Sequence, residues 1–324
     1  MSNKLINLLM ILLISVFFLS CEEDFSPFGD FREKYVLTCI LRSDTTFQIA
    51  TLSSSYFTGT INPDDNETDP AVKFADIRVW YEDSVYLFRD SSIVRVDTSR
   101  YTTQISFYFS NRFKITPNKP IEIEVLMQNG KRLKAASVTP KEVNFSNQSS
   151  VLIPPVTGNL INVILSNGST GTFYQPKLYF RYQKRINNIT TYHEMEIPSR
   201  YSVIDGIEEP VYPVPSNKQT LVYNMDVINK TMAYLSASEP EDVIFSIYEN
   251  LIMKLVILDE NLTRYVSSTS QSFDDLTVRV NENDYSNVEG GLGIFGSYII
   301  KEYDRLRFRA NFITSFGYNF IKEN

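Results

Sequence analysis

The stretch PIEIEVLMQNGKRLKAASV, residues 120–138, decides the fold class of this chain. Its first part alternates with a period of two, so the isoleucines and the valine of residues 121–125 would face a core while Glu122 and Glu124 face solvent. Asn129-Gly130 follows, and both residue types tolerate a positive φ. The stretch therefore predicts an antiparallel hairpin with one buried face.

Short apolar runs with the same character precede this hairpin. The chain contains 22 phenylalanines and 20 tyrosines, residue types that favour strands. In residues 105–109 the odd positions are expected to face the core. Eight closely spaced strands predict an immunoglobulin-like or transthyretin-like β-sandwich over residues 33–145. The expected strands are Lys34–Arg42, Thr46–Ser53, Ala75–Tyr81, Val85–Arg89, Ile93–Asp97, Thr103–Phe109, Ile121–Met127 and Arg132–Val138.

A stretch rich in proline, serine and asparagine follows the sandwich, and a second β-rich domain is predicted over residues 150–324. Four prolines in residues 198–218 indicate a long loop. Asp259 is placed to cap one short helix that would run to about Ser272. The last strands expected are Gly296–Glu302 and Leu306–Ile313.

The N-terminus has the build of a secretory leader. In residues 1–20 a lysine precedes an apolar run that is too short to span a bilayer comfortably. Cys21 follows the small residue Ser20, and this arrangement resembles a bacterial lipobox. We therefore expect cleavage before Cys21, acylation of its thiol, and a membrane-anchored body held by a tether over residues 21–32.

Three acidic residues, Glu22, Glu23 and Asp24, directly follow the cysteine. The cluster resembles a surface-export signal of Bacteroidota lipoproteins, which predicts an outer-membrane protein exposed at the cell surface. The alternatives are an ordinary solvated linker and an anchor on the periplasmic face.

Charge and cysteine content narrow the classes of function. Loss of the leader moves the formal net charge from −7 to −8, and this acidic balance argues against a nucleic-acid partner. With Cys21 acylated, Cys39 has no disulfide partner, and its apolar strand predicts a small buried side chain. No cofactor is expected.

Two patterns that could indicate chemistry carry little weight. Residues 291–296 match G-x-G-x-x-G, but a polar stretch precedes them and a strand pattern follows, so a tight glycine turn packing Ile294 and Phe295 is expected instead of a dinucleotide site. His193 is the only histidine, which cannot supply a multi-histidine zinc shell.

An acidic loop is the one candidate metal site, and it is a weak one. Asp64, Asp65, Glu67 and Asp69 supply oxygen ligands of the kind that calcium prefers, but the spacing and central glycine of an EF-hand are missing. A solvated loop tip is the simpler interpretation.

The segment YSNVEGGLGIFGSY, residues 285–298, resembles the C-terminal signature of a Bacteroidota lipoprotein family, domain of unknown function 4249. The residues that carry the resemblance are Asn287, Glu289, Gly290, Gly291, Gly293, Phe295 and Gly296. The resemblance implies an outer-membrane lipoprotein that has no established enzymatic activity and accompanies TonB-dependent transporters.

Three functions stay open at this point. The first is a non-enzymatic binding or accessory lipoprotein beside a TonB-dependent barrel. The second is a stand-alone module for glycan binding or adhesion that uses exposed aromatic residues, with Tyr56, Phe57, Phe173 and Tyr174 as candidates. The third is a hydrolase whose carboxylates meet only in the folded chain.

Overall fold

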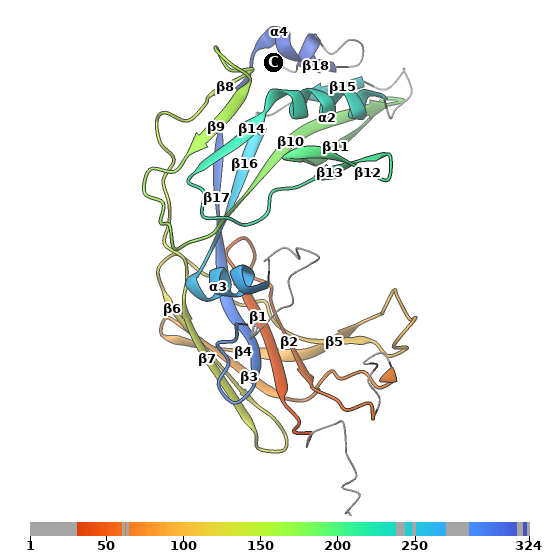
Figure 1. Cartoon of the computed structure of the whole chain (residues 1–324), viewed down its shortest axis with the longest axis vertical. Helices are drawn as coiled ribbons and strands as arrows, with labels where there is room; N and C mark the ends of the chain where they lie inside the picture. Colours follow the sequence, from red (N-terminus) through yellow and green to blue (C-terminus); the bar gives the residue numbers. More distant parts are fainter. Residues whose placement is uncertain are drawn as a thin grey trace, which may run out of the picture.

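The computed structural model of the 324-residue chain describes residues 31–59, 62, 65–237, 244–247, 251–269, 285–315 and 320–322. These residues form a mainly β protein, as the sequence predicts, with three short helices where the sequence predicts one. Figure 1 shows an elongated, curved molecule with two lobes. We call residues 31–145 the first lobe, and residues 150–258 with 309–322 the second lobe.

The first lobe is a β-sandwich in which the strands of residues 31–145 pair antiparallel with one another. Its described strands are β1 (Tyr35–Arg42), β2 (Gln48–Ser54), β3 (Asp76–Tyr81), β4 (Ser84–Ile93), β5 (Ile105–Ser110), β6 (Pro120–Leu126) and β7 (Arg132–Val138). Their order is β1-β2-β5-β4-β3-β6-β7. The long strand β4 connects the layers, because Phe88 pairs with β3 and Arg89 pairs with β5.

The hairpin of β6 and β7 is confirmed. Ile121, Ile123 and Val125 are buried, and the charged residues between them face outward. Ile123 lies opposite Ala135, and Gly130 in the connecting turn has a φ of 80°. The period-two pattern thus fixes both the register and the inward face of this pair.

The prediction for β5 was wrong about which face is buried. Tyr108 and Ser110 are buried, whereas Ile105 is 36% exposed. The Tyr108 hydroxyl donates to the carbonyl of Val72 at 2.8 Å and accepts from the amide of Ala75 at 3.1 Å. Because these backbone partners satisfy its hydroxyl, the large tyrosine ring can occupy the core and turns the odd positions outward.

The second lobe contains the remaining strands and two of the helices. Its strands are β8 (Leu152–Ile153), β9 (Leu160–Ile164), β10 (Tyr174–Ile186), β11 (Ile189–Ile197), β12 (Arg200–Ile204), β13 (Ile207–Val211), β14 (Thr220–Asn224), β15 (Ile244–Ile247), β16 (Leu251–Leu258) and β18 (Phe320–Lys322). Its helices are α2 (Met225–Ala237) and α4 (Ala310–Thr314). Strands β11, β15 and β16 pair with β10, while β9 pairs with β14.

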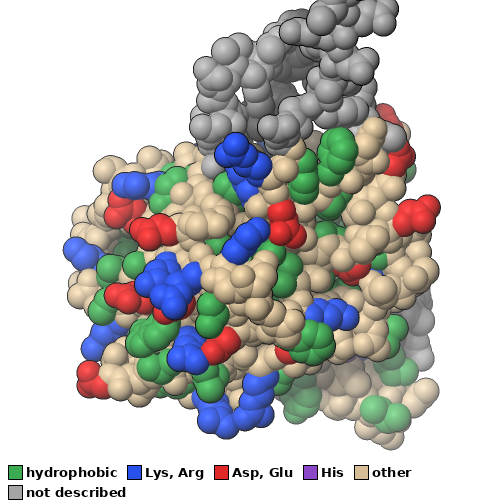
Figure 2. All heavy atoms as spheres, turned by 90° about the horizontal axis from the view of Figure 1, so that it is seen from below, with side chains coloured by type: hydrophobic (Ala, Val, Ile, Leu, Met, Phe, Trp, Pro, Cys, Tyr) green, Lys and Arg blue, Asp and Glu red, His purple; other side chains and the backbone are tan. Residues whose placement is uncertain are grey.

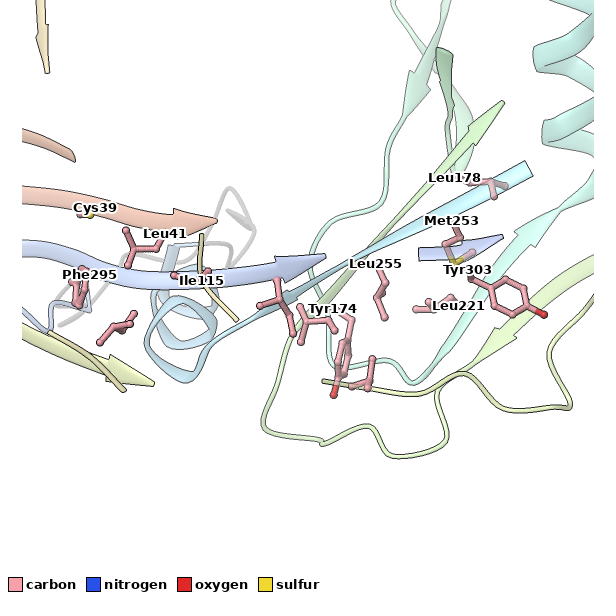
Figure 3. Close-up of a cluster of buried hydrophobic side chains, with 14 of the residues drawn as sticks. Cys39, Leu41, Ile115, Tyr174, Leu178, Leu221, Met253, Leu255, Phe295 and Tyr303 are labelled. Atoms are coloured by element: carbon pink, nitrogen blue, oxygen red, sulfur yellow. The ribbon is translucent and has the colours of Figure 1, made fainter. Parts of the chain in front are cut away.

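Strand β17 (Leu292–Phe308) belongs to both lobes. Residues 292–298 pair in parallel with β1, and residues 298–306 pair antiparallel with β16. Figure 3 shows this strand running from beside Cys39 and Leu41 toward Leu255 and Tyr303, and the buried side chains of both lobes form one continuous core. The two separate strands predicted after residue 296 are therefore one strand, and α4 follows it. The predicted domain boundary near residues 145–150 stays a prediction.

Several elements were not predicted from the sequence, and a hairpin and a helix are the longest of them. Residues 198–218 contain the hairpin of β12 and β13, whose turn residues Asp205 and Gly206 both have positive φ. An Asp-Gly turn is a strong hairpin signal. The prediction gave more weight to the four prolines of this segment and therefore expected a loop. Helix α2 was also not predicted, although its buried residues Ile228 and Met232 have helical spacing.

Helix α3 (Glu260–Thr269) confirms the predicted short helix as far as Thr269, and the continuation to Ser272 lies outside the described residues. Asp259 caps it, since its Oδ1 accepts the amide of Leu262 at 2.7 Å. In Figure 1, α3 lies beside β17 where the two lobes meet. None of the helices in the described part of the chain has the length and apolar character needed to cross a bilayer.

Candidate functional site

The signature segment, residues 285–298, is a loop that leads directly into β17. Asn287 closes the loop, because its side chain donates to the carbonyl of Phe295 at 2.7 Å and accepts the Phe295 amide at 2.9 Å. Glu289 pairs through its backbone with Lys134 of β7, in both directions, at 2.8 and 3.1 Å. The segment thus adds to the edge of the sandwich before it joins β1.

Glycines in this segment allow close approach to neighbouring backbone. Gly290 and Gly293 have φ values of 81° and 116°, which non-glycine residues rarely adopt. A Cβ at Gly290 would overlap the carbonyl oxygen of Arg132, and one at Gly293 would overlap that of Leu37. The prediction of a tight glycine turn over residues 291–296 was therefore wrong in its extent. Only residues 290–291 form a turn, and the strand begins at residue 292. Ile294 and Phe295 are buried, as expected.

Asp259 connects three elements at this point. It is 2% exposed, and its Oδ2 accepts the hydroxyl of Ser137 from β7 at 2.8 Å and that of Ser297 from β17 at 2.9 Å. Burial raises the pKa of its carboxyl, and the hydrogen bonds, including the Leu262 cap, offset this rise only in part. The carboxylate binds β7, β17 and α3 together.

A second link joins α3 to the first lobe. Asn261 donates through Nδ2 to the carbonyl of Ala136 at 3.0 Å, and the hydroxyl of Tyr285 donates to Asn261 Oδ1 at 2.7 Å. We call this arrangement of residues 285–298 with Asp259 and Asn261 the lobe junction. The packing and hydrogen bonds of this junction give the signature residues a structural role.

A groove of about 490 Å³ lies beside the lobe junction, and we call it the tryptophan groove. Trp80, the only tryptophan, lies opposite Glu122, which in turn lies opposite the small Ala136. Asn287 and Glu289 line the same groove. The sequence contained a signal for Trp80, since it alternates with buried residues on β3 and so must face outward.

The predicted anchor, Cys21 with Glu22, Glu23 and Asp24, lies outside the described residues, as does Asp64 of the acidic loop. Within that loop Asp65 accepts a hydrogen bond from Asn62 at 3.0 Å. Asp69 forms an ion pair with Arg95 at 2.6 Å, and Glu67 is exposed and takes part in neither contact. Among the described residues no three histidine, cysteine or acidic side chains are grouped to hold a metal.

The other candidates have structural surroundings. His193 Nε2 lies 2.7 Å from the hydroxyl oxygen of Thr191, and its ring stacks on Tyr182. The G-x-G-x-x-G letters are followed by β17 in place of the helix that a dinucleotide site requires. Cys39 is a buried free cysteine, as predicted, and burial raises the pKa of its thiol.

The aromatic residues proposed for glycan binding do not share one surface. Tyr174 is 1% exposed and belongs to the core, so its place among exposed aromatics was wrong. Phe57 is 52% exposed and stacks on Phe31 at 5.9 Å between ring centres. Tyr56 lies beside Phe57 in the first lobe, whereas Phe173 is half-buried in the second.

These features define a mainly β protein whose two lobes share one long strand and meet at a glycine-rich junction. The chain belongs to the family described as Domain of unknown function (DUF4249), whose profile matches residues 22–304. The resemblance noted from the signature segment is confirmed. No curated protein matches the chain.

Proposed function

We propose that the mature protein is a lipid-anchored, non-enzymatic binding protein of the outer membrane that serves a TonB-dependent transporter as an accessory. The observation that carries the proposal is Cys21, placed after a secretory leader and before three acidic residues. Acylation of this cysteine would fix one end of the chain to the membrane, and the acidic residues would direct that end to the cell surface.

The placement of the chain ends supports this arrangement. In Figure 1 the described chain begins in the first lobe at one end of the molecule, and β18, its last described strand, lies at the opposite end. Nine residues lie between Cys21 and Phe31, and the ten steps from one Cα atom to the next permit a reach of at most about 35 Å. The first lobe would therefore stay close to the membrane, while the second would stand away from it.

The lobe junction supports a role in presenting a surface. Because β17 is shared and the core is continuous, the lobes are expected to move as one body. Figure 2 views the molecule from below, and on this face basic and acidic side chains lie interspersed with hydrophobic ones. Such a mixed surface suits a protein partner better than a polyanion.

One observation favours glycan binding as a second candidate. The tryptophan groove combines a flat indole with Glu122, Glu289 and Asn287, and aromatic faces with polar neighbours suit the apolar faces and hydroxyls of sugars. A glycan array with wild-type protein and a Trp80→Ala variant tests it. A response that Trp80→Ala abolishes would favour this function, and a flat response from folded wild-type protein would count against it.

The anchor is tested in the native host with three forms of the full chain: wild type, Cys21→Ser, and a triple alanine variant of Glu22, Glu23 and Asp24. We expect labelled fatty acid to be incorporated into the wild type and the triple variant, and none into Cys21→Ser. External protease should digest the wild type on intact cells and spare the triple variant. Equal labelling of wild type and Cys21→Ser would refute the anchor.

A further inference from the structure

A second groove, of about 410 Å³, lies on the face of the shared sheet opposite the continuous core. Strands β1, β10, β16 and β17 form its floor, and helix α3 closes one end. We call it the lysine groove. Its apolar lining comes from Ile40, Val256, Leu258, Leu262, Val266 and Ile300.

Two of the cations in the lysine groove already have partners. Arg42 pairs with Asp44 at 2.5 Å and lies over the ring of Tyr298. Lys254 pairs with Glu194 at 2.9 Å and lies 4.4 Å from the centre of the Tyr179 ring. Their charges are therefore compensated within the protein.

Glu194 is well suited to hold Lys254. Burial raises the pKa of this carboxyl, but hydrogen bonds from Lys254 and Arg181 outweigh burial and leave the pKa below its ordinary value. The carboxylate thus stays charged near neutral pH, and both of its oxygens are occupied by these two cations.

Lys177 is different. It is half-buried, lines the groove, and has no hydrogen-bond or ion-pair partner among the described residues. It also lies directly opposite Lys254 in the register of β10 and β16. Like charges in directly opposed positions of a sheet are destabilising, and partial burial of an ammonium costs free energy that a nearby opposite charge offsets. An anion from outside the chain would remove both costs.

We propose that the lysine groove binds a small amphiphilic anion, a carboxylate or phosphate head group on a short hydrocarbon or aromatic body. Lys177 is the counter-ion of the head group, and Val256, Leu258 and Ile300 pack against the body. The volume lies within the range of small-molecule sites, which combine apolar linings with a few placed polar groups. The inference rests on the groove alone and does not depend on the anchor or on a transporter.

The test is calorimetric titration of the mature, lipidated protein in nanodiscs, with empty nanodiscs as the blank. The probes are octanoate and octyl phosphate, which distinguish the two head groups, and octan-1-ol, which keeps the body without the charge. Acetate and inorganic phosphate supply the charge without the body. We expect saturable one-site binding of octanoate, octyl phosphate or both. Octan-1-ol, acetate and inorganic phosphate should bind at least roughly tenfold more weakly.

Variants assign the binding to this groove. Lys177→Met keeps the aliphatic stem, and we expect it to bind the anion roughly tenfold more weakly or worse. Lys141→Met removes the same charge from an exposed position outside the groove and should leave affinity unchanged. Lys177→Glu should reverse the charge preference of the groove, so that this variant binds octylamine more tightly than octanoate.

Three results would overturn the proposal. The first is the absence of saturable binding of both eight-carbon anions to wild-type protein. The second is equal binding of octanoate, octyl phosphate and octan-1-ol, which would indicate apolar partition only. The third is equal affinity of folded Lys177→Met and Lys141→Met for the anion.

Discussion

The carboxylate of Asp259 accepts a hydrogen bond from the hydroxyl of Ser137 at 2.8 Å, although 122 residues separate the two in the chain. Ser137 lies on β7 of the first lobe, and Asp259 follows the last residue of β16 in the second. The same carboxylate caps α3. This contact is a partly buried polar link between the lobes. The apolar core that β17 shares with both lobes is a further link.

Replacing this carboxylate should destabilise the protein. Asp259→Ala removes a helix cap and leaves the hydroxyls of Ser137 and Ser297 without their acceptor, so we expect a loss of about 2–4 kcal/mol in the free energy of unfolding by urea. Glu260→Ala, on the exposed start of α3, is the control and should cost about 0.5 kcal/mol or less. A change in Asp259→Ala as small as the control would contradict the role of the link.

The raised pKa of Asp259 predicts a pH dependence. Because burial raises the native pKa above the unfolded value, the native state binds more protons between these two values, and stability falls as pH rises through the native pKa. Asp259→Asn retains a capping oxygen and removes this titration. The free energy of unfolding of wild type minus that of Asp259→Asn should therefore decrease as pH rises from below 3.8. A difference that increases with pH would show that the pKa is lowered.

The glycine segment can be tested with a matched pair of substitutions. Gly293→Ala forces a side chain against the backbone of Leu37 at a φ of 116°, and we expect a loss of about 4 kcal/mol or more. Gly130→Ala also has a positive φ, but open space surrounds that position, so its cost should be about 1 kcal/mol. Thermal unfolding of both variants measures this difference, and Gly293→Ala should have the lower melting temperature. Equal melting temperatures would argue against close packing of β17 on β1.

Cys39 should resist alkylation in the native protein. It is 0% exposed, so a reagent cannot reach its sulfur, and burial raises the pKa of its thiol, so little of the reactive thiolate is present at pH 8. Mass spectrometry should find little iodoacetamide adduct on native protein and complete modification in concentrated urea. Rapid labelling of the native form would show that β1 opens.

The sequence predicts some elements well because local pattern and tertiary burial agree there. The alternation in residues 121–125 and the Asn129-Gly130 turn gave the correct hairpin, and Asp259 was identified as a cap. In β5 the serines at positions 106 and 110 made the odd positions look like the apolar face, so periodicity chose the wrong face. The backbone partners of Tyr108 bury the even positions instead.

The sites depend on pairings between distant strands. Trp80 and Glu122 become neighbours only through the register of β3 and β6, and Lys177 meets Lys254 only through β10 and β16. The glycines of residues 290–296 suggested a turn because glycine is typical of turns. Their contact with the backbone of β1, which is far away in the sequence, leaves no local pattern that could have predicted a strand.

The accessory role is tested most directly by a pull-down of the tagged, lipidated protein from outer membranes in mild detergent, read by mass spectrometry, with Cys21→Ser as the control. We expect recovery of one TonB-dependent barrel in stoichiometric amount with wild type, and its loss with Cys21→Ser. Recovery of the tagged protein alone, under conditions that keep other envelope complexes intact, would contradict the accessory role.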